Sequence, residues 1–116
     1  MSGADYRLRA ADAALLSGFP SAAVSDAYYA ALYAARAALS EEERYAKTHR
    51  GTWSLFRELF VLTHRVGADL FQGAHRIQDV REAADYDARE LSAEEADAII
   101  SDARRFVAAV ASLLAP

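Results

Sequence analysis

Apolar residues recur every three or four positions along most of the chain, and this is the period of a helix with one buried face. The pattern predicts five helices, at residues 4–17, 22–39, 52–63, 68–87 and from residue 93 onward. No segment alternates between apolar and polar residues in the manner of a half-buried strand. The sequence therefore predicts an all-α fold, an up-and-down bundle of four to five helices.

Three of these helices carry the side chains that should form the core. The second has a stripe of apolar and small residues at Val24, Tyr28, Leu32, Ala35 and Leu39. The last has a similar seam at Ala96, Ile99, Ala103, Phe106, Val110 and Leu113. The third should turn its large aromatic residues inward, namely Trp53, Phe56 and Phe60. Helices packed lengthwise in a bundle bury stripes of this kind.

Short signals in the sequence mark the expected helix ends. Gly18 should end the first helix, and Gly67 should separate the third from the fourth. Ser21 is a suitable N-cap for the second helix. Ser92 and Glu95 have the spacing of a capping box, which predicts the start of the last helix.

The composition indicates one folded domain that spans residues 1–116. Of these residues 53% are hydrophobic, which is too many for a disordered chain, and there is no cysteine to form disulfides. The net charge of −4 argues against a general binder of duplex DNA. Cations nevertheless concentrate in the middle of the chain, between residues 44 and 65, so a local site for RNA or a nucleotide is compatible with this charge.

Other classes of protein lack their signatures in this sequence. Residues 1–9 have no apolar signal segment, and the longest apolar run, 27–35, is too short to cross a membrane. We therefore expect a cytoplasmic protein with no membrane association. Glycine-rich nucleotide loops and metal-ligand motifs are absent, and the three histidines fall on different elements. We expect no cofactor and no bound metal.

The segment Lys47-Thr48-His49-Arg50-Gly51 is the strongest candidate for a site, because it gathers polar groups in the longest break between helices. Arg44 precedes His49 with four residues between them. Lys47, Thr48, Arg50 and Arg44 are candidate binding residues, and His49 is a candidate catalytic residue. The alternative interpretation is a solvated connector whose histidine caps a neighbouring helix.

Arg81 is the second candidate, because it falls on the apolar stripe of the fourth helix and a sheltered cation needs a partner. Asp85, four residues later, could pair with it across one turn, and Tyr86 follows. The alternative is an arginine directed at a phosphate. We expect His49 and Arg81 to share a pocket, with Gly51 turning the backbone inward, Asp85 orienting one of the two groups and the Tyr86 hydroxyl nearby.

The order and spacing of these pieces resemble the compact, stand-alone branch of the HEPN domain family. The resemblance covers nearly the whole chain, and it rests on residues 26–30, residues 32–39, residues 47–51, Phe56, residues 60–61, Arg81 and residues 84–86. It implies a helical bundle that usually forms a two-fold homodimer. Many members are metal-independent endoribonucleases or toxins, and others bind nucleotides or RNA without cleaving them. Small members are often paired with a minimal nucleotidyltransferase that acts as antitoxin.

The family's ribonuclease signature is an arginine followed, after four to six residues, by a histidine, normally on the helix that carries Arg81. Here Asp85 and Tyr86 occupy the places of that histidine, so the signature is incomplete. The resemblance leaves three hypotheses. The first is a non-catalytic component of a toxin–antitoxin or defence-type system that binds RNA or nucleotide and pairs with a nucleotidyltransferase, with Tyr86 as acceptor for nucleotide transfer. The second is an endoribonuclease using Arg81 and His49. The third is a structural interaction module.

Overall fold

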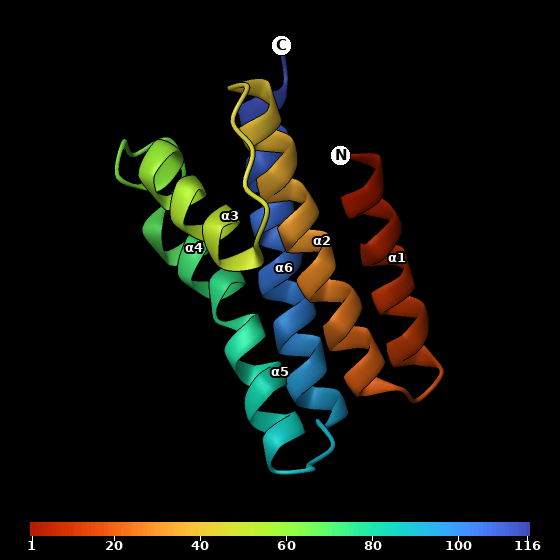
Figure 1. The fold of residues 1–116 in the computed structure, drawn as a ribbon. Coiled ribbons are helices and arrows are strands. Elements are labelled where there is room, and N and C mark those ends of the chain that lie inside the picture. Colours follow the sequence, from red (N-terminus) through yellow and green to blue (C-terminus); the bar gives the residue numbers. More distant parts are fainter.

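The computed structural model describes residues 1–116, and all of its regular elements are helices (Figure 1). They are α1 (Ser2–Leu16), α2 (Pro20–Glu41), α3 (His49–Phe56), the π-helical turn η1 (Arg57–Val61), α4 (Ala68–His75), α5 (Ile77–Tyr86) and α6 (Ala93–Leu114). The expected third helix corresponds to α3 with η1, and the expected fourth to α4 with α5. The all-α prediction is confirmed. None of the helices combines the length and the apolar character that a membrane span requires.

Helix α2 lies at the centre of the bundle, with α1 on one side, α3, α4 and α5 on the other, and α6 behind it (Figure 1). It packs against α1, α3, α5 and α6. Half of its residues are buried, and most of these are alanines. Alanine favours the helix and leaves little side chain between neighbouring backbones, so several helices can approach α2 closely. The expected stripe on this helix is buried at every position.

An aromatic cluster fills the space between α3, α4 and α6. The Phe106 ring lies 5.2 Å from Phe56 and 5.7 Å from Trp53, measured between ring centroids, and it is fully buried. Phe56 in turn stacks on Phe71 of α4. The predicted seam of α6 is buried at Ala96, Ala103, Phe106 and Val110, whereas Ile99 and Leu113 are only half-buried. Ile100 and Val107 complete the buried face instead.

The observed helix ends agree with some of the signals in the sequence and differ from others. The capping box of Ser92 and Glu95 is present, with both of its hydrogen bonds at 3.0 Å. The predicted N-cap at Ser21 is wrong, because α2 begins at Pro20, whose ring is already set for the first helical position. The Ser21 hydroxyl instead accepts a 3.4 Å hydrogen bond from the backbone N–H of Leu91. Gly18, with φ of 87°, makes the turn before α2.

The connector of residues 42–48 determines where α3 begins. It runs back along the bundle, because His49 lies beside Tyr28 rather than beside Glu41, the last residue of α2. Tyr28 and Glu41 are about 20 Å apart along the helix axis at 1.5 Å per residue. Seven residues can span at most about 23–25 Å. The connector is therefore just long enough to return the chain to the middle of α2, where the candidate site forms.

Candidate functional site

His49 is the first residue of α3, and Thr48 is its N-cap. The Thr48 hydroxyl oxygen accepts a 2.9 Å hydrogen bond from the Gly51 N–H. Thr48, and not His49, is thus the residue that caps a helix. The N–H groups of His49 and Arg50 lie in the first turn, where no intrahelical acceptor is available. This end of α3 combines free N–H donors with the positive end of the helix dipole.

Gly51 has a different role from the one expected. It lies inside α3 with an ordinary helical backbone, so it does not turn the chain inward. A Cβ at this position would lie 2.9 Å from the Thr48 hydroxyl oxygen, closer than real Cβ contacts. A larger residue at position 51 would therefore displace the Thr48 hydroxyl that caps the helix.

Tyr28 joins α2 to α3 through its hydroxyl group. Its oxygen lies 3.2 Å from His49 Nδ1, and it accepts a 3.3 Å hydrogen bond from Trp53 Nε1. With the His49 proton on Nε2, the Tyr28 O–H donates to Nδ1, so His49 Nδ1, the Tyr28 hydroxyl and Trp53 Nε1 all have partners. The Tyr28 side chain is fully buried, and burial raises its pKa, so the phenol stays neutral and holds the imidazole in place.

Arg81 of α5 lies against the same pair of tyrosines as His49. Its guanidinium carbon is 5.1 Å from the Tyr28 ring centroid and 5.7 Å from that of Tyr29. The His49 ring centroid is 5.7 Å and 6.0 Å from the same two centroids. The structure thus brings the imidazole and the guanidinium to one aromatic platform, made of Tyr28 and Tyr29.

The expected ion pair of Arg81 with Asp85 does not form. Arg81 Nη1 instead donates a 2.8 Å hydrogen bond to Gln78 Oε1. Side chains on a helix lean toward its N-terminus, so Arg81 reaches back to residue 78 rather than forward to residue 85. Asp85 is exposed, and Tyr86 is 91% exposed at the end of α5. Neither residue contributes to the neighbourhood of His49, which corrects the expectation from the sequence.

A cleft of about 290 Å³ opens beside His49, between α2, α3 and the α4–α5 junction. It is lined by Tyr28, His49, Arg50, Trp53, His75, Gln78, Asp79 and Glu82. His75 was not a candidate from the sequence, because no spacing relates it to His49. It reaches the cleft because its ring packs 5.9 Å from Trp53 and 5.3 Å from Phe71. Only the packing of α4 on α3 makes this contact. No group of three or more His, Cys, Asp or Glu side chains is arranged to hold a metal ion.

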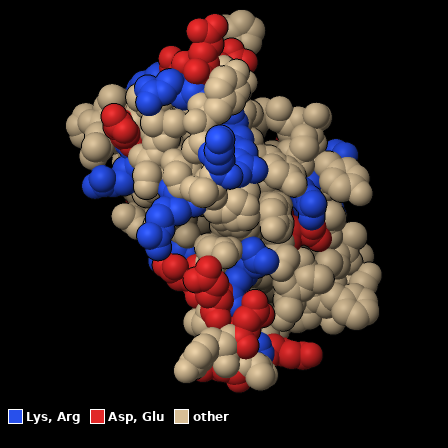
Figure 2. Space-filling model, viewed as in Figure 1, with Lys and Arg blue, Asp and Glu red and all other residues tan.

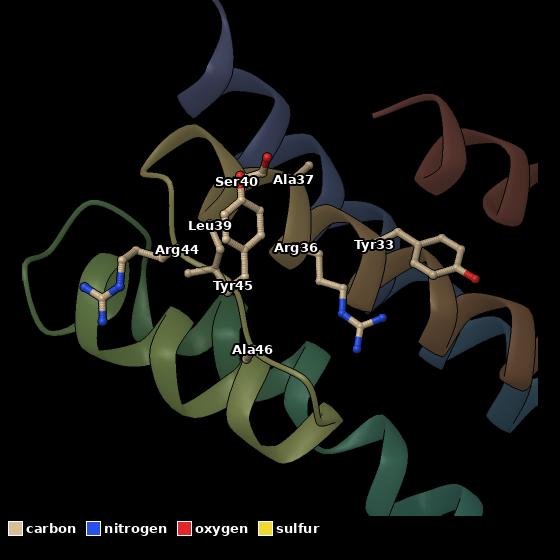
Figure 3. A pocket seen from close by; sticks show the side chains of 8 residues that line it. All are labelled: Tyr33, Arg36, Ala37, Leu39, Ser40, Arg44, Tyr45 and Ala46. Atoms are coloured by element: carbon tan, nitrogen blue, oxygen red, sulfur yellow. The ribbon is translucent and has the colours of Figure 1, made fainter.

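Arg44 belongs to a second pocket, at the end of α2. This connector pocket has a volume of about 350 Å³, and Figure 3 shows the residues that line it: Tyr33, Arg36, Ala37, Leu39, Ser40, Arg44, Tyr45 and Ala46. Arg44 and His49 therefore do not meet in one site, despite their four-residue spacing. The connector between them runs along the bundle and separates their side chains.

The cations of this chain fall into two groups. Six of the 13 Lys and Arg residues form ion pairs with Asp or Glu, and these are Arg7, Arg65, Arg76, Arg89, Arg104 and Arg105. The others make no ion pair, and all of them except Arg9 lie between residues 36 and 81, at Arg36, Arg44, Lys47, Arg50, Arg57 and Arg81. On the face in Figure 2, Lys and Arg gather across the middle, and Asp and Glu lie mostly toward the two ends. We call these six residues the unpaired cations.

The fold and the site define a class of small helical-bundle proteins with a cationic, histidine-containing face. A family model described as "HEPN domain" matches residues 1–113. A protein of Methanocaldococcus jannaschii named "Putative toxin MJ0142" is 31% identical over 105 residues, which cover 90% of this chain and 71% of that protein. The chain belongs to the HEPN domain family. The resemblance noted from the sequence is thereby confirmed.

Proposed function

We propose that this HEPN protein is a toxin-type component that binds RNA or a nucleotide on the face formed by α2, α3 and α5. The observation that carries the proposal is the set of unpaired cations, because elsewhere on the molecule nearly every arginine is neutralised by a carboxylate. A fixed group of cations without carboxylate partners is suited to the phosphates of a nucleic acid. The toxin name of the archaeal relative supports the same assignment.

Two of the unpaired cations are half-buried, and this makes their lack of an anion informative. Arg81 is held on the Tyr28 and Tyr29 rings, and Arg36 has only a 3.4 Å hydrogen bond from its Nε to the Thr52 hydroxyl. A sheltered guanidinium gains from a partner that can accept several N–H donors, and a phosphate does so in bidentate geometry. Bound phosphates would therefore complete interactions that the protein leaves open.

RNA binding can be measured by fluorescence anisotropy of a labelled single-stranded oligonucleotide over a range of salt concentrations. We expect binding that weakens steeply with salt, because phosphate contacts release counterions. Lys47→Ala or Arg50→Ala should reduce the salt slope by roughly 0.7 each. Arg9→Ala is the matched control, since Arg9 is exposed, has no ion pair and lies on α1. The proposal fails if wild type does not bind at low salt, or if Arg9→Ala weakens binding as much as Arg50→Ala.

The same proposal includes a nucleotidyltransferase partner, which the family resemblance implies. Tyr86 is suited to be the acceptor of a nucleotide, because its 91% exposed side chain at the end of α5 is open to a second protein. Transfer would join the phenol oxygen to the α-phosphate of a nucleoside triphosphate and release pyrophosphate. A test is to incubate the chain with a minimal nucleotidyltransferase, of the kind paired with small members of the family, and ATP, and then to measure the mass of the chain. Wild type should gain one adenylate group and Tyr86→Phe none, and modification of both variants alike would exclude Tyr86.

A metal-independent endoribonuclease is the second candidate, and it is favoured by one observation. His49 and His75 line one cleft, so it contains two imidazoles, the side chain most often used as general base and general acid. One imidazole would take the proton of a ribose 2′-hydroxyl, whose oxygen attacks the adjacent phosphorus. The other would protonate the leaving 5′-oxygen, and the product would end in a 2′,3′-cyclic phosphate. Arg81 does not line the cleft but lies on the Tyr28 ring that also contacts His49, and in this candidate function it would act with His49 by stabilising the phosphate charge.

Cleavage of mixed RNA in the presence of EDTA separates these alternatives. If the protein is an endoribonuclease, wild type should leave products that end in a cyclic phosphate. The cleavage rate of His49→Ala should be at least a hundredfold lower than that of wild type. If RNA is bound but not cleaved, the endoribonuclease is excluded and the hypothesis of a non-catalytic component is supported. The third hypothesis, a structural interaction module, requires that neither binding nor cleavage is detected.

A further inference from the structure

The connector pocket differs in chemistry from the cleft beside His49. No carboxylate lines it, whereas Asp79 and Glu82 line the cleft. Its inner surface is apolar, formed by Ala37, Leu39 and Ala46. Its lining thus combines an apolar interior with cations and contains no carboxylate.

Tyr45 is the exposed aromatic side chain of this pocket. The residue is 76% exposed, and its side chain makes no hydrogen bond and no aromatic contact. Figure 3 shows the ring beside the end of α2, with the side chains of Arg44 and Arg36 on opposite sides of it. The Tyr45 ring therefore contributes little to the stability of the fold. An open ring flanked by cations is the arrangement that proteins use to stack a base of single-stranded nucleic acid.

We propose that the connector pocket holds one unstacked base of a bound single-stranded RNA, with the base against Tyr45 and the adjoining phosphates near Arg36 and Arg44. This inference rests on the proposed function and specifies its substrate class. The strand would continue past Lys47 toward Arg50, because the connector that carries Tyr45 leads directly to the start of α3. A duplex cannot use the pocket, since its bases are stacked and paired and its shallow groove displays only their edges.

The test measures the affinity of Tyr45 variants for single-stranded RNA and for a duplex of the same length. Tyr45→Ala should weaken single-strand binding roughly tenfold or more and leave both duplex binding and the salt slope unchanged, because stacking involves no counterion release. Tyr45→Phe keeps the ring and should bind as wild type does. Tyr6→Ala is the matched control, as it removes another exposed tyrosine, which lies on α1 outside both pockets.

Photocrosslinking supplies a second readout. Single-stranded RNA that contains 5-iodouridine should form an adduct at Tyr45, located by mass spectrometry of the digested protein. The pocket inference is overturned if Tyr45→Ala binds single-stranded RNA as tightly as wild type while binding remains salt-dependent. That result would leave the proposed RNA binding by the unpaired cations supported. It is also overturned if adducts form only elsewhere. If wild type binds no RNA at low salt, the proposed function fails together with this inference.

Discussion

The Tyr28 hydroxyl oxygen lies 3.2 Å from His49 Nδ1, which connects the middle of α2 to the first residue of α3. Trp53 donates to the same oxygen from one turn further along α3. The orientation of His49 is therefore not a property of the connector that precedes it. It is determined by the buried phenol of Tyr28 on α2, 21 residues earlier in the chain.

The first prediction concerns this phenol. Tyr28→Phe keeps the ring but removes the hydroxyl, so Trp53 Nε1 and His49 Nδ1 lose their partner. We expect the free energy of unfolding to fall by about 1–3 kcal/mol, because a buried N–H is left unsatisfied. Urea denaturation measures the change. Tyr86→Phe should have no effect, and an equal loss in that variant would contradict the role given to Tyr28.

The second prediction concerns alkaline pH. Burial raises the pKa of Tyr28 above its ordinary value of 10.0, so folding favours the protonated phenol. The stabilisation from Tyr28 should be fully present below about pH 10 and should be lost as the pH rises through the higher folded-state pKa. Denaturation of wild type and Tyr28→Phe over this range should give a difference in unfolding free energy that shrinks with pH. A constant difference would show that Tyr28 titrates alike in both states.

The third prediction concerns the core. Phe106 is fully buried between Phe56 and Trp53, so truncation leaves a cavity that three helices line. Phe106→Ala should cost about 3–5 kcal/mol, which is a large part of the stability of a domain of this size. Leu16→Ala is the control, because Leu16 is 91% exposed. A melting temperature within a degree or two of wild type for Phe106→Ala would contradict the packing described above.

The fourth prediction is a two-fold homodimer, which the family resemblance implies. We expect an interface above roughly 1,000 Å² in total that uses parts of α2 and of the α4–α5 segment. Tyr29, half-buried on α2 beside Arg81, is a residue of suitable character for its centre. Light scattering at tens of micromolar should give twice the mass of the 12.6 kDa chain. A monomer under these conditions would exclude the dimer.

The sequence by itself determined the features of this protein that depend on local order along the chain. The buried stripe of α2, with Tyr28 and Leu32 at its centre, follows from helical periodicity, and the capping box at Ser92 follows from a spacing of three residues. The polar segment before Gly51 also stood out because it interrupts that periodicity. The predictions of the buried stripe and of the capping box succeed because each depends on neighbours within about two helical turns.

Only the tertiary structure decided which side chains share a site. His75 reaches the His49 cleft because α4 packs its aromatic residues on α3, and Arg44 is separated from His49 because the two residues line different pockets, one at the end of α2 and one beside Tyr28. Arg81 lies in the same neighbourhood as His49 because its guanidinium packs on tyrosine rings supplied by α2. Contacts of this kind join residues far apart in sequence, and their geometry depends on how whole helices pack, which no local spacing encodes.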